Sequence, residues 1–214
     1  MHIYFLITLL SLVSPASAGN QDFMISWPFV AQKDPGDRSK IDAQFEMGYY
    51  KGTQFDSLMT TGPTRVQDCQ IDSAIFNGPG DVSDSTIKEL IANGPIKLVN
   101  STVDQMIING PCQIKKLTTK EDFIMNGPLR ASGLKAGKII ASSTEIVLSK
   151  SVVGEIVIKE PENGSEEQVL RLASTTVKGS ITFKSGKGRV IIQDDKVKYK
   201  SLVGATVDER EEDE

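Results

Sequence analysis

The chain has 214 residues, a formal net charge of −4 and only two cysteines, and its single histidine is His2. Acids and bases are interspersed along its body, so no basic stripe is present that would bind nucleic acid or an anionic lipid surface. Two cysteines without a Cys-x-x-Cys motif exclude a disulfide-built scaffold and leave a structural zinc site without ligands.

Residues 1–18 have the composition of an export signal. An apolar run from Ile3 to Val13 precedes Ala16-Ser17-Ala18, and these small residues predict cleavage after Ala18. The run is too short for a membrane-spanning helix. Cleavage removes His2, and with it the side chain most used as a general base and as a metal ligand. We expect a secreted or periplasmic protein with no membrane span after cleavage; a retained anchor and a buried amino-terminal helix are the alternatives.

Residues 19–46 show no repeat and contain turn signals such as Asp34-Pro35-Gly36-Asp37. They predict an extended leader or an amino-terminal cap. At the other end, residues 208–214 hold six acids and one base. This composition is typical of a solvated acidic tail.

An Asn-Gly-Pro triplet recurs four times after the leader. Its members are Asn77, Asn93, Asn109 and Asn126, then Gly78, Gly94, Gly110 and Gly127, then Pro79, Pro95, Pro111 and Pro128. Thr61-Gly62-Pro63 is a degenerate copy one step earlier. The glycines are 16, 16 and 17 residues apart, and a short fixed period indicates a solenoid.

Apolar residues recur in register between the triplets. One column is Val66, Val82, Leu98 and Ile114, and the pair before each turn is Ala74-Ile75, Leu90-Ile91, Met106-Ile107 and Phe123-Ile124. The unit is too short for two helices with ordinary connections, and it is rich in β-branched residues. A short capped helix over 84–91 is the alternative. We therefore predict parallel β-coils, each with three short β segments.

The triplet suits a corner of such a coil. Glycine tolerates positive φ, proline lacks a donor for the sheet, and both favour a turn. Asparagines stacked at equivalent corners can join their side-chain amides in a hydrogen-bonded ladder. Cys69 and Cys112 fall three coil rises apart, about 14 Å. A disulfide allows a Cα separation of only about 7 Å, so we expect no bond between them.

The repeat period changes after residue 128. Gly154, Gly179 and Gly204 are each 25 residues apart, which fits a coil of about 18 residues plus a loop at 161–167 and a turn at 185–188. The expected core residues of the connecting stretch are Leu129, Ala131, Leu134, Ile139, Ile140, Ile146 and Leu148. The fold class that follows is all-β: a single-domain parallel β-helix, or β-solenoid, over 47–207. Asn-Gly-Pro coils run to about 128 and longer-period coils cover 129–207.

The segments Ser151–Ile156 and Thr175–Ile181 resemble repeats of the bactofilins, a polymer-forming class of short-coil β-solenoids. The chain is more similar still to uncharacterised exported bacterial proteins with Asn-Gly-Pro repeats. The bactofilin resemblance implies a solenoid fold and a scaffold role. Bactofilins are usually cytosolic and Asn-Gly-Pro corners are not their hallmark, whereas this chain has the sequence of an export signal and has those corners.

Pairs of carboxylates are the catalytic groups that this composition still allows, because enzymes that cleave polysaccharides need only Asp and Glu. The candidates are Asp81, Asp84, Asp104, Glu121, Asp122, Asp194 and Asp195. They do not recur in register, and the only tryptophan, Trp27, lies outside the repeats. We expect no catalytic, cofactor or metal site.

Two functions stay open. The first is a non-enzymatic surface, envelope or interaction scaffold, whose partner is an unknown protein, an envelope component or a further copy of the chain in a homo-oligomer. The second is a carbohydrate-binding or carbohydrate-active solenoid that uses Asp and Glu on one face. A groove with two carboxylates and exposed aromatic residues would favour the second function, and a flat polar face the first.

Overall fold

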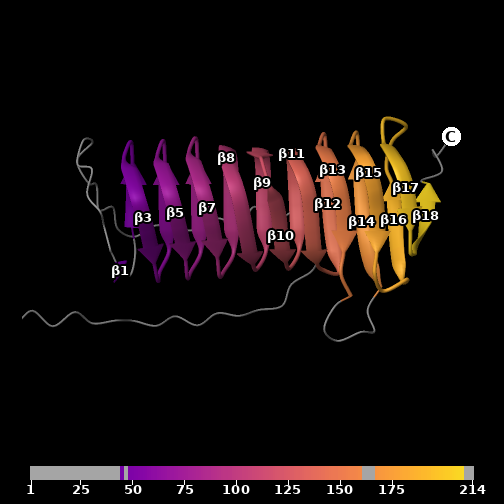
Figure 1. Ribbon diagram of the computed structural model, residues 1–214, viewed down its shortest axis with the longest axis horizontal. Coiled ribbons are helices and arrows are strands. Elements are labelled where there is room, and N and C mark those ends of the chain that lie inside the picture. The colour runs from indigo at the N-terminus through magenta and orange to yellow at the C-terminus, as the bar shows by residue number, and fades with distance from the viewer. Residues whose placement is uncertain (1–43, 46–47, 161–166, 210–214) are drawn as a thin grey trace, which may run out of the picture.

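The computed structural model describes residues 44–45, 48–160 and 167–209, which form one parallel β-solenoid of about nine turns with coils about 17 residues long (Figure 1). The strands follow one another along the long axis in sequence order. No helix in these ranges is long and apolar enough to cross a membrane. The expected signal, nearly all of the leader and residues 210–214 lie outside the described residues.

Each coil contains a short and a long β segment, and β8 and β11 run through both as single strands. The first coils comprise β1 (Gln44–Phe45), β2 (Gly48–Lys51), β3 (Gln54–Thr60), β4 (Thr64–Gln67), β5 (Gln70–Phe76), β6 (Gly80–Ser83), β7 (Thr86–Ala92) and β8 (Ile96–Asn109). The middle coils comprise β9 (Cys112–Thr119), β10 (Asp122–Asn126), β11 (Leu129–Ser142), β12 (Glu145–Ser149) and β13 (Val152–Ile158). The last coils comprise β14 (Gln168–Ala173), β15 (Thr176–Phe183), β16 (Gly188–Ile192), β17 (Lys198–Val203) and β18 (Ala205–Glu209).

The pairing agrees with the prediction of three short β segments per coil, but in most coils the second and third segments belong to one long strand, such as β5, whose pairing is interrupted at Asp72. That strand bends where two successive side chains face outward: in β5, Ile71 and Ala74 are buried, whereas Asp72 is exposed and Ser73 is half-buried. Ordinary alternation would allow only one outward residue there. The helical alternative at 84–91 is wrong, since Thr86–Ala92 is a strand.

All coils pair in parallel with the apolar residues in register. Between β5 and β7, Ile71 lies beside Ile87 and Ala74 beside Leu90. The inward columns of successive coils form one continuous core. Each apolar side chain buried in it stabilises the fold by roughly 1.5–3 kcal/mol before entropy is counted.

One corner of most coils uses a left-handed residue, and in several coils a buried hydroxyl follows it. Asp84 has φ 51°, a conformation that Asp and Asn tolerate better than most residues. The hydroxyl of the next residue, Ser85, donates to the carbonyl of Ser83 at 2.6 Å and accepts the Cys69 N–H at 3.0 Å. Related bonds recur at Ser101, Ser151 and Thr175. These hydroxyls satisfy backbone groups that would otherwise be buried without a partner.

The Asn-Gly-Pro corners stack as the repeat predicts. The side-chain amide of Asn93 donates to Asn77, that of Asn109 to Asn93 and that of Asn126 to Asn109, each at 2.8 Å. The glycines allow the close approach, because a Cβ added at Gly94 would lie 2.9 Å from the Gly78 carbonyl oxygen.

The second half follows the same pattern with two differences from expectation. Six of the seven expected core residues of 129–150 are buried, but Ile140 is only half-buried and faces outward. Gly154 and Gly179 stack closely, whereas Gly204 is a corner residue with φ 75° beside Phe183. The last strand continues to Glu209, so it includes the first two residues of the expected tail.

Both cysteines are free thiols inside the solenoid. Cys69 is 2% exposed and occupies the hydroxyl position of the left-handed corner, where its thiol contacts the Gln67 carbonyl. Cys112 begins β9 in the core. Burial raises the pKa of both thiols, which makes them poor nucleophiles in the folded protein.

The ladder predicts unequal effects of two identical substitutions. Asn109→Ala removes two ladder hydrogen bonds, whereas Asn126→Ala removes one. At the lower end of the usual range for a hydrogen bond, the first substitution lowers the free energy of unfolding by about 1 kcal/mol and the second by about half as much. Urea unfolding measures both values. Equal losses would show that the amides do not act as a continuous ladder.

Candidate functional site

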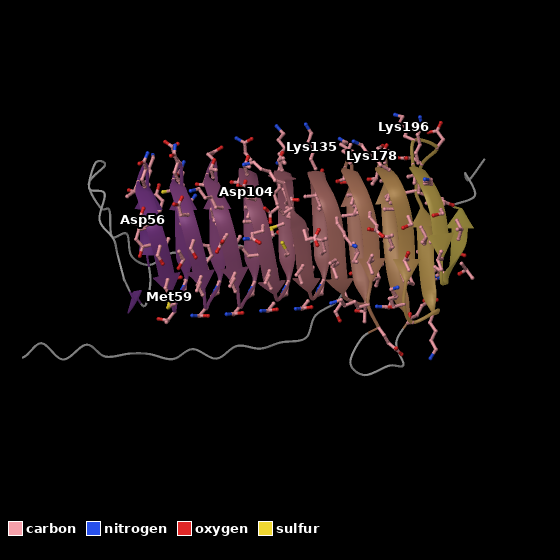
Figure 2. The ribbon with its side chains drawn as sticks, viewed as in Figure 1. Asp56, Met59, Asp104, Lys135, Lys178 and Lys196 are labelled. Carbon is pink, nitrogen blue, oxygen red and sulfur yellow. The ribbon has the colours of Figure 1, made fainter. Side chains whose placement is uncertain are left out.

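A column of aliphatic side chains runs along the outside of the solenoid. It is formed by the second residue of each apolar pair and its equivalents, and we call it the isoleucine column. Its members are Met59, Ile75, Ile91, Ile107, Ile124, Ile140 and Val157, which are in register from coil to coil. Successive residues of a strand point to opposite faces, so these residues face outward while their predecessors are buried. Figure 2 labels Met59, where the column begins.

Two polar columns flank the isoleucine column. On one side the outward residues are Ser57, Ser73, Glu89, Gln105, Asp122, Lys138, Glu155 and Ser180. On this side Gln105 donates to Glu89 at 3.1 Å and Lys138 pairs with Glu155 at 3.1 Å. On the other side lies the asparagine ladder. The apolar column is therefore bordered on one side by a mixed polar column, in which Glu89, Asp122 and Glu155 are the carboxylates, and on the other side by the amides of the asparagine ladder.

Coils are numbered from the one that begins at Gly48, so coil 3 is residues 80–95, coil 4 is 96–111 and coil 5 is 112–128. A groove of about 630 Å³ lies on this face over coils 3 to 5. It is lined by Glu89, Leu90, Ile91, Gln105, Met106, Ile107, Glu121, Asp122 and Ile124. Ile107, at its centre, has 38% of its surface exposed, which is high for an isoleucine. A volume in this range is typical of sites that hold a ligand or a short peptide segment.

Coil 5 has seventeen residues where the preceding coils have sixteen, and the extra residue lies beside the groove. The backbone N–H groups of Lys120 and Glu121 both donate to the Asp104 carbonyl, at 3.2 and 2.9 Å. Two residues thus oppose one, as in a β-bulge, and the strand is interrupted between Thr119 and Asp122. The insertion leaves the core register intact, since Phe123 still lies beside Met106. Its consequence is an added carboxylate, Glu121, in the lining of the groove.

Of the carboxylates singled out in the sequence, only Glu121 and Asp122 belong to the groove. Asp81 lies between Arg65 and Lys97 on the short-strand sheet, and Asp84 accepts a hydrogen bond from Asn100 at the left-handed corner. Asp104 pairs with Lys120 at 2.8 Å. These residues have structural partners and do not converge.

The other candidate pair is also structural. The Ser174 hydroxyl and N–H donate to Asp194 at 2.7 and 2.8 Å, which lowers the pKa of Asp194. Asp195, the next residue, is exposed.

Sequence reasoning missed Glu89 and the outward position of the isoleucines. The signal for the second was present, because a column of isoleucines follows a column of varied apolar residues in every unit. Both columns are apolar, so hydrophobicity alone did not tell which of them faces outward.

The groove's lining supplies three carboxylates, one amide and aliphatic surface. It contains no nucleophilic hydroxyl or thiol, and no aromatic ring for a sugar to stack on. Among the residues that the structure describes, no group of three Asp, Glu, Cys or His side chains is placed to hold a metal ion. The arrangement is suited to binding an apolar segment that carries positive charge.

Comparison of the chain with protein-family models, with curated proteins and with solved structures gives no match. The resemblance to the bactofilins therefore rests on the sequence segments alone.

The inward and outward assignment can be tested at two neighbouring residues. Met106 is 2% exposed and Ile107 is 38% exposed. We expect Met106→Ala to lower the free energy of unfolding by about 2–5 kcal/mol, because it leaves a cavity in the core. Ile107→Ala should cost less than about 1 kcal/mol, since its side chain is partly in water already. Denaturant unfolding measures both free energies of unfolding. A larger loss for Ile107→Ala than for Met106→Ala would show that Ile107 is the residue that faces the core.

Proposed function

We propose that this protein is an exported, non-enzymatic interaction scaffold that binds a protein partner on the isoleucine column. The observation that carries the proposal is the groove over coils 3 to 5, whose centre is Ile107 and whose lining includes Glu89 and Asp122. Exposed aliphatic surface bordered by fixed charge is characteristic of interaction sites. The strands beneath it are paired on both sides, so the site is rigid before a partner arrives.

The chemistry of the groove defines the partner. Aliphatic or aromatic side chains of the partner would cover Ile91, Ile107 and Ile124, and donor side chains such as lysine, arginine or an amide would approach the carboxylates. Opposite charge at the border speeds encounter and selects partners, while the apolar contact supplies most of the affinity.

A carbohydrate ligand is the second candidate. The three carboxylates Glu89, Glu121 and Asp122 favour it, because they could accept hydrogen bonds from sugar hydroxyl groups. The lining has no aromatic side chain, which makes the protein partner the better supported of the two.

A random peptide library displayed on phage tests the proposal directly. We expect enriched peptides that combine apolar residues with lysine or arginine, and that bind Ile107→Lys protein at least about tenfold more weakly because the new charge repels them. The control is Ile191→Lys, an outward isoleucine of the short-strand sheet, which should bind normally. Peptides that ignore the Ile107 substitution would refute the proposal. Binding on a glycan array that depends on Glu89 and Asp122 would instead support the carbohydrate ligand.

Export is the remaining part of the proposal, and it rests on the sequence of residues 1–18. We expect the protein recovered from outside the cytoplasm of a bacterial host to begin at Gly19, as found by amino-terminal sequencing. Retention in the cytoplasm with an intact amino terminus would contradict export without affecting the binding face.

A further inference from the structure

We propose that a second copy of this chain packs against the isoleucine column. The two solenoid axes are parallel, and the two-fold rotation axis that relates the copies lies between them and is parallel to both. This inference rests on the proposed function, because it names a partner for the same face. It differs from the peptide proposal in requiring the whole length of the column and not the groove alone.

The two-fold axis is suited to the geometry of the column. The outward residues are in register at every coil from Met59 to Val157 and continue through Thr182 to Val203. A two-fold axis parallel to the solenoid places each residue of the column opposite the same residue of the partner copy. The side chains meet in register along the strip, because the repeat advances by one inter-strand spacing per coil.

The size of the strip is sufficient for a specific dimer. Eight steps from Met59 to Val203 at about 4.8 Å give a length of about 38 Å. The column and its two polar borders are about 14 Å wide, at roughly 6.8 Å between alternate residues of a strand. Each chain therefore contributes about 500 Å², and the pair about 1,000 Å². This area is at the lower limit of specific interfaces and predicts a dimer that dissociates on dilution.

Charge favours this orientation. The two-fold axis brings the carboxylate border of one chain opposite the asparagine border of the other at the same coil. Glu89 then faces the partner's Asn93, because both lie in coil 3. Asp122 faces the partner's Asn126 in coil 5, and Glu155 faces the partner's Lys159 in coil 7. Each of these three carboxylates thus meets an amide or ammonium donor, and no two like charges of the two border columns are opposed at any coil from Ser57 to Lys184. Such pairing selects the arrangement.

Light scattering after size exclusion tests for the dimer. The full mature chain should show a mass that rises from one chain toward two as its concentration increases through the micromolar range. Ile107→Glu places a carboxylate against its own copy on the two-fold axis and should hold the mass at one chain throughout. Val147→Glu is the matched control, since Val147 is an outward aliphatic residue between Arg130 and Arg171 on the short-strand sheet, and it should dimerise normally.

Spin labels measure the orientation. The single variants Ile75→Cys, Ile107→Cys and Ile140→Cys place one label in coils 2, 4 and 6. Parallel axes predict the same short distance between the two labels of the dimer at all three positions. Antiparallel axes would give a short distance at one position at most and much longer ones elsewhere. The native thiols are buried and should not react, so the unsubstituted protein is the control for labelling.

Two results would overturn the inference: a mass of one chain at every concentration, or label distances that differ among the three positions. Neither result affects the peptide experiment, which measures binding at the groove and does not require a dimer. Peptides that bind a monomeric protein through Ile107 would therefore retain the proposed function while refuting the second copy as its partner.

Discussion

The structure depends on one constraint: each residue of a coil lies one inter-strand spacing from its equivalent in the next coil. Parallel in-register pairing allows little lateral shift, so a side chain must be compatible with a near copy of itself above and below. Asparagine meets this condition by donating to and accepting from its own kind. Glycine meets it by leaving room for the neighbouring carbonyl. The residues repeat along the sequence because of this requirement.

The same constraint explains how the solenoid tolerates irregularity. An extra residue cannot be accommodated in an inward column without shifting every later side chain. In coil 5 it is placed at the bend, where Lys120 and Glu121 share the Asp104 carbonyl and the core register resumes at Phe123. This departure from the period lies at the surface and leaves the core register unchanged.

The proposed function rests on the outward columns. The inward columns repeat because packing requires it, whereas an outward column can be charged, amide-bearing or aliphatic. Along this chain one outward column alternates Asp72 with Lys88 and Asp104 with Lys120 in ion pairs, and Asp72 raises the pKa of Lys88 by hydrogen bonding and by its charge. The isoleucine column differs, because water does not favour aliphatic side chains in a continuous row. Both proposals rest on that difference.

The sequence alone determined the architecture. The spacing of the Asn-Gly-Pro triplets predicts the coil length, the corner and the asparagine ladder, because these depend only on which residues recur at the same offset. It also places Val66, Val82, Leu98 and Ile114 in one buried column.

Only the tertiary structure decided which of two adjacent apolar columns faces outward. The inward and outward alternation restarts at the bend of the long strand, where Asp72 and Ser73 both point away from the core. Without that bend Ile75 would be buried with Ile71; with it Ala74 is buried and Ile75 faces outward. A periodic sequence does not mark the bend, because polar residues occur at outward positions throughout. The location of the proposed binding face is therefore a property of the folded coil, determined by how the long strand turns around the core.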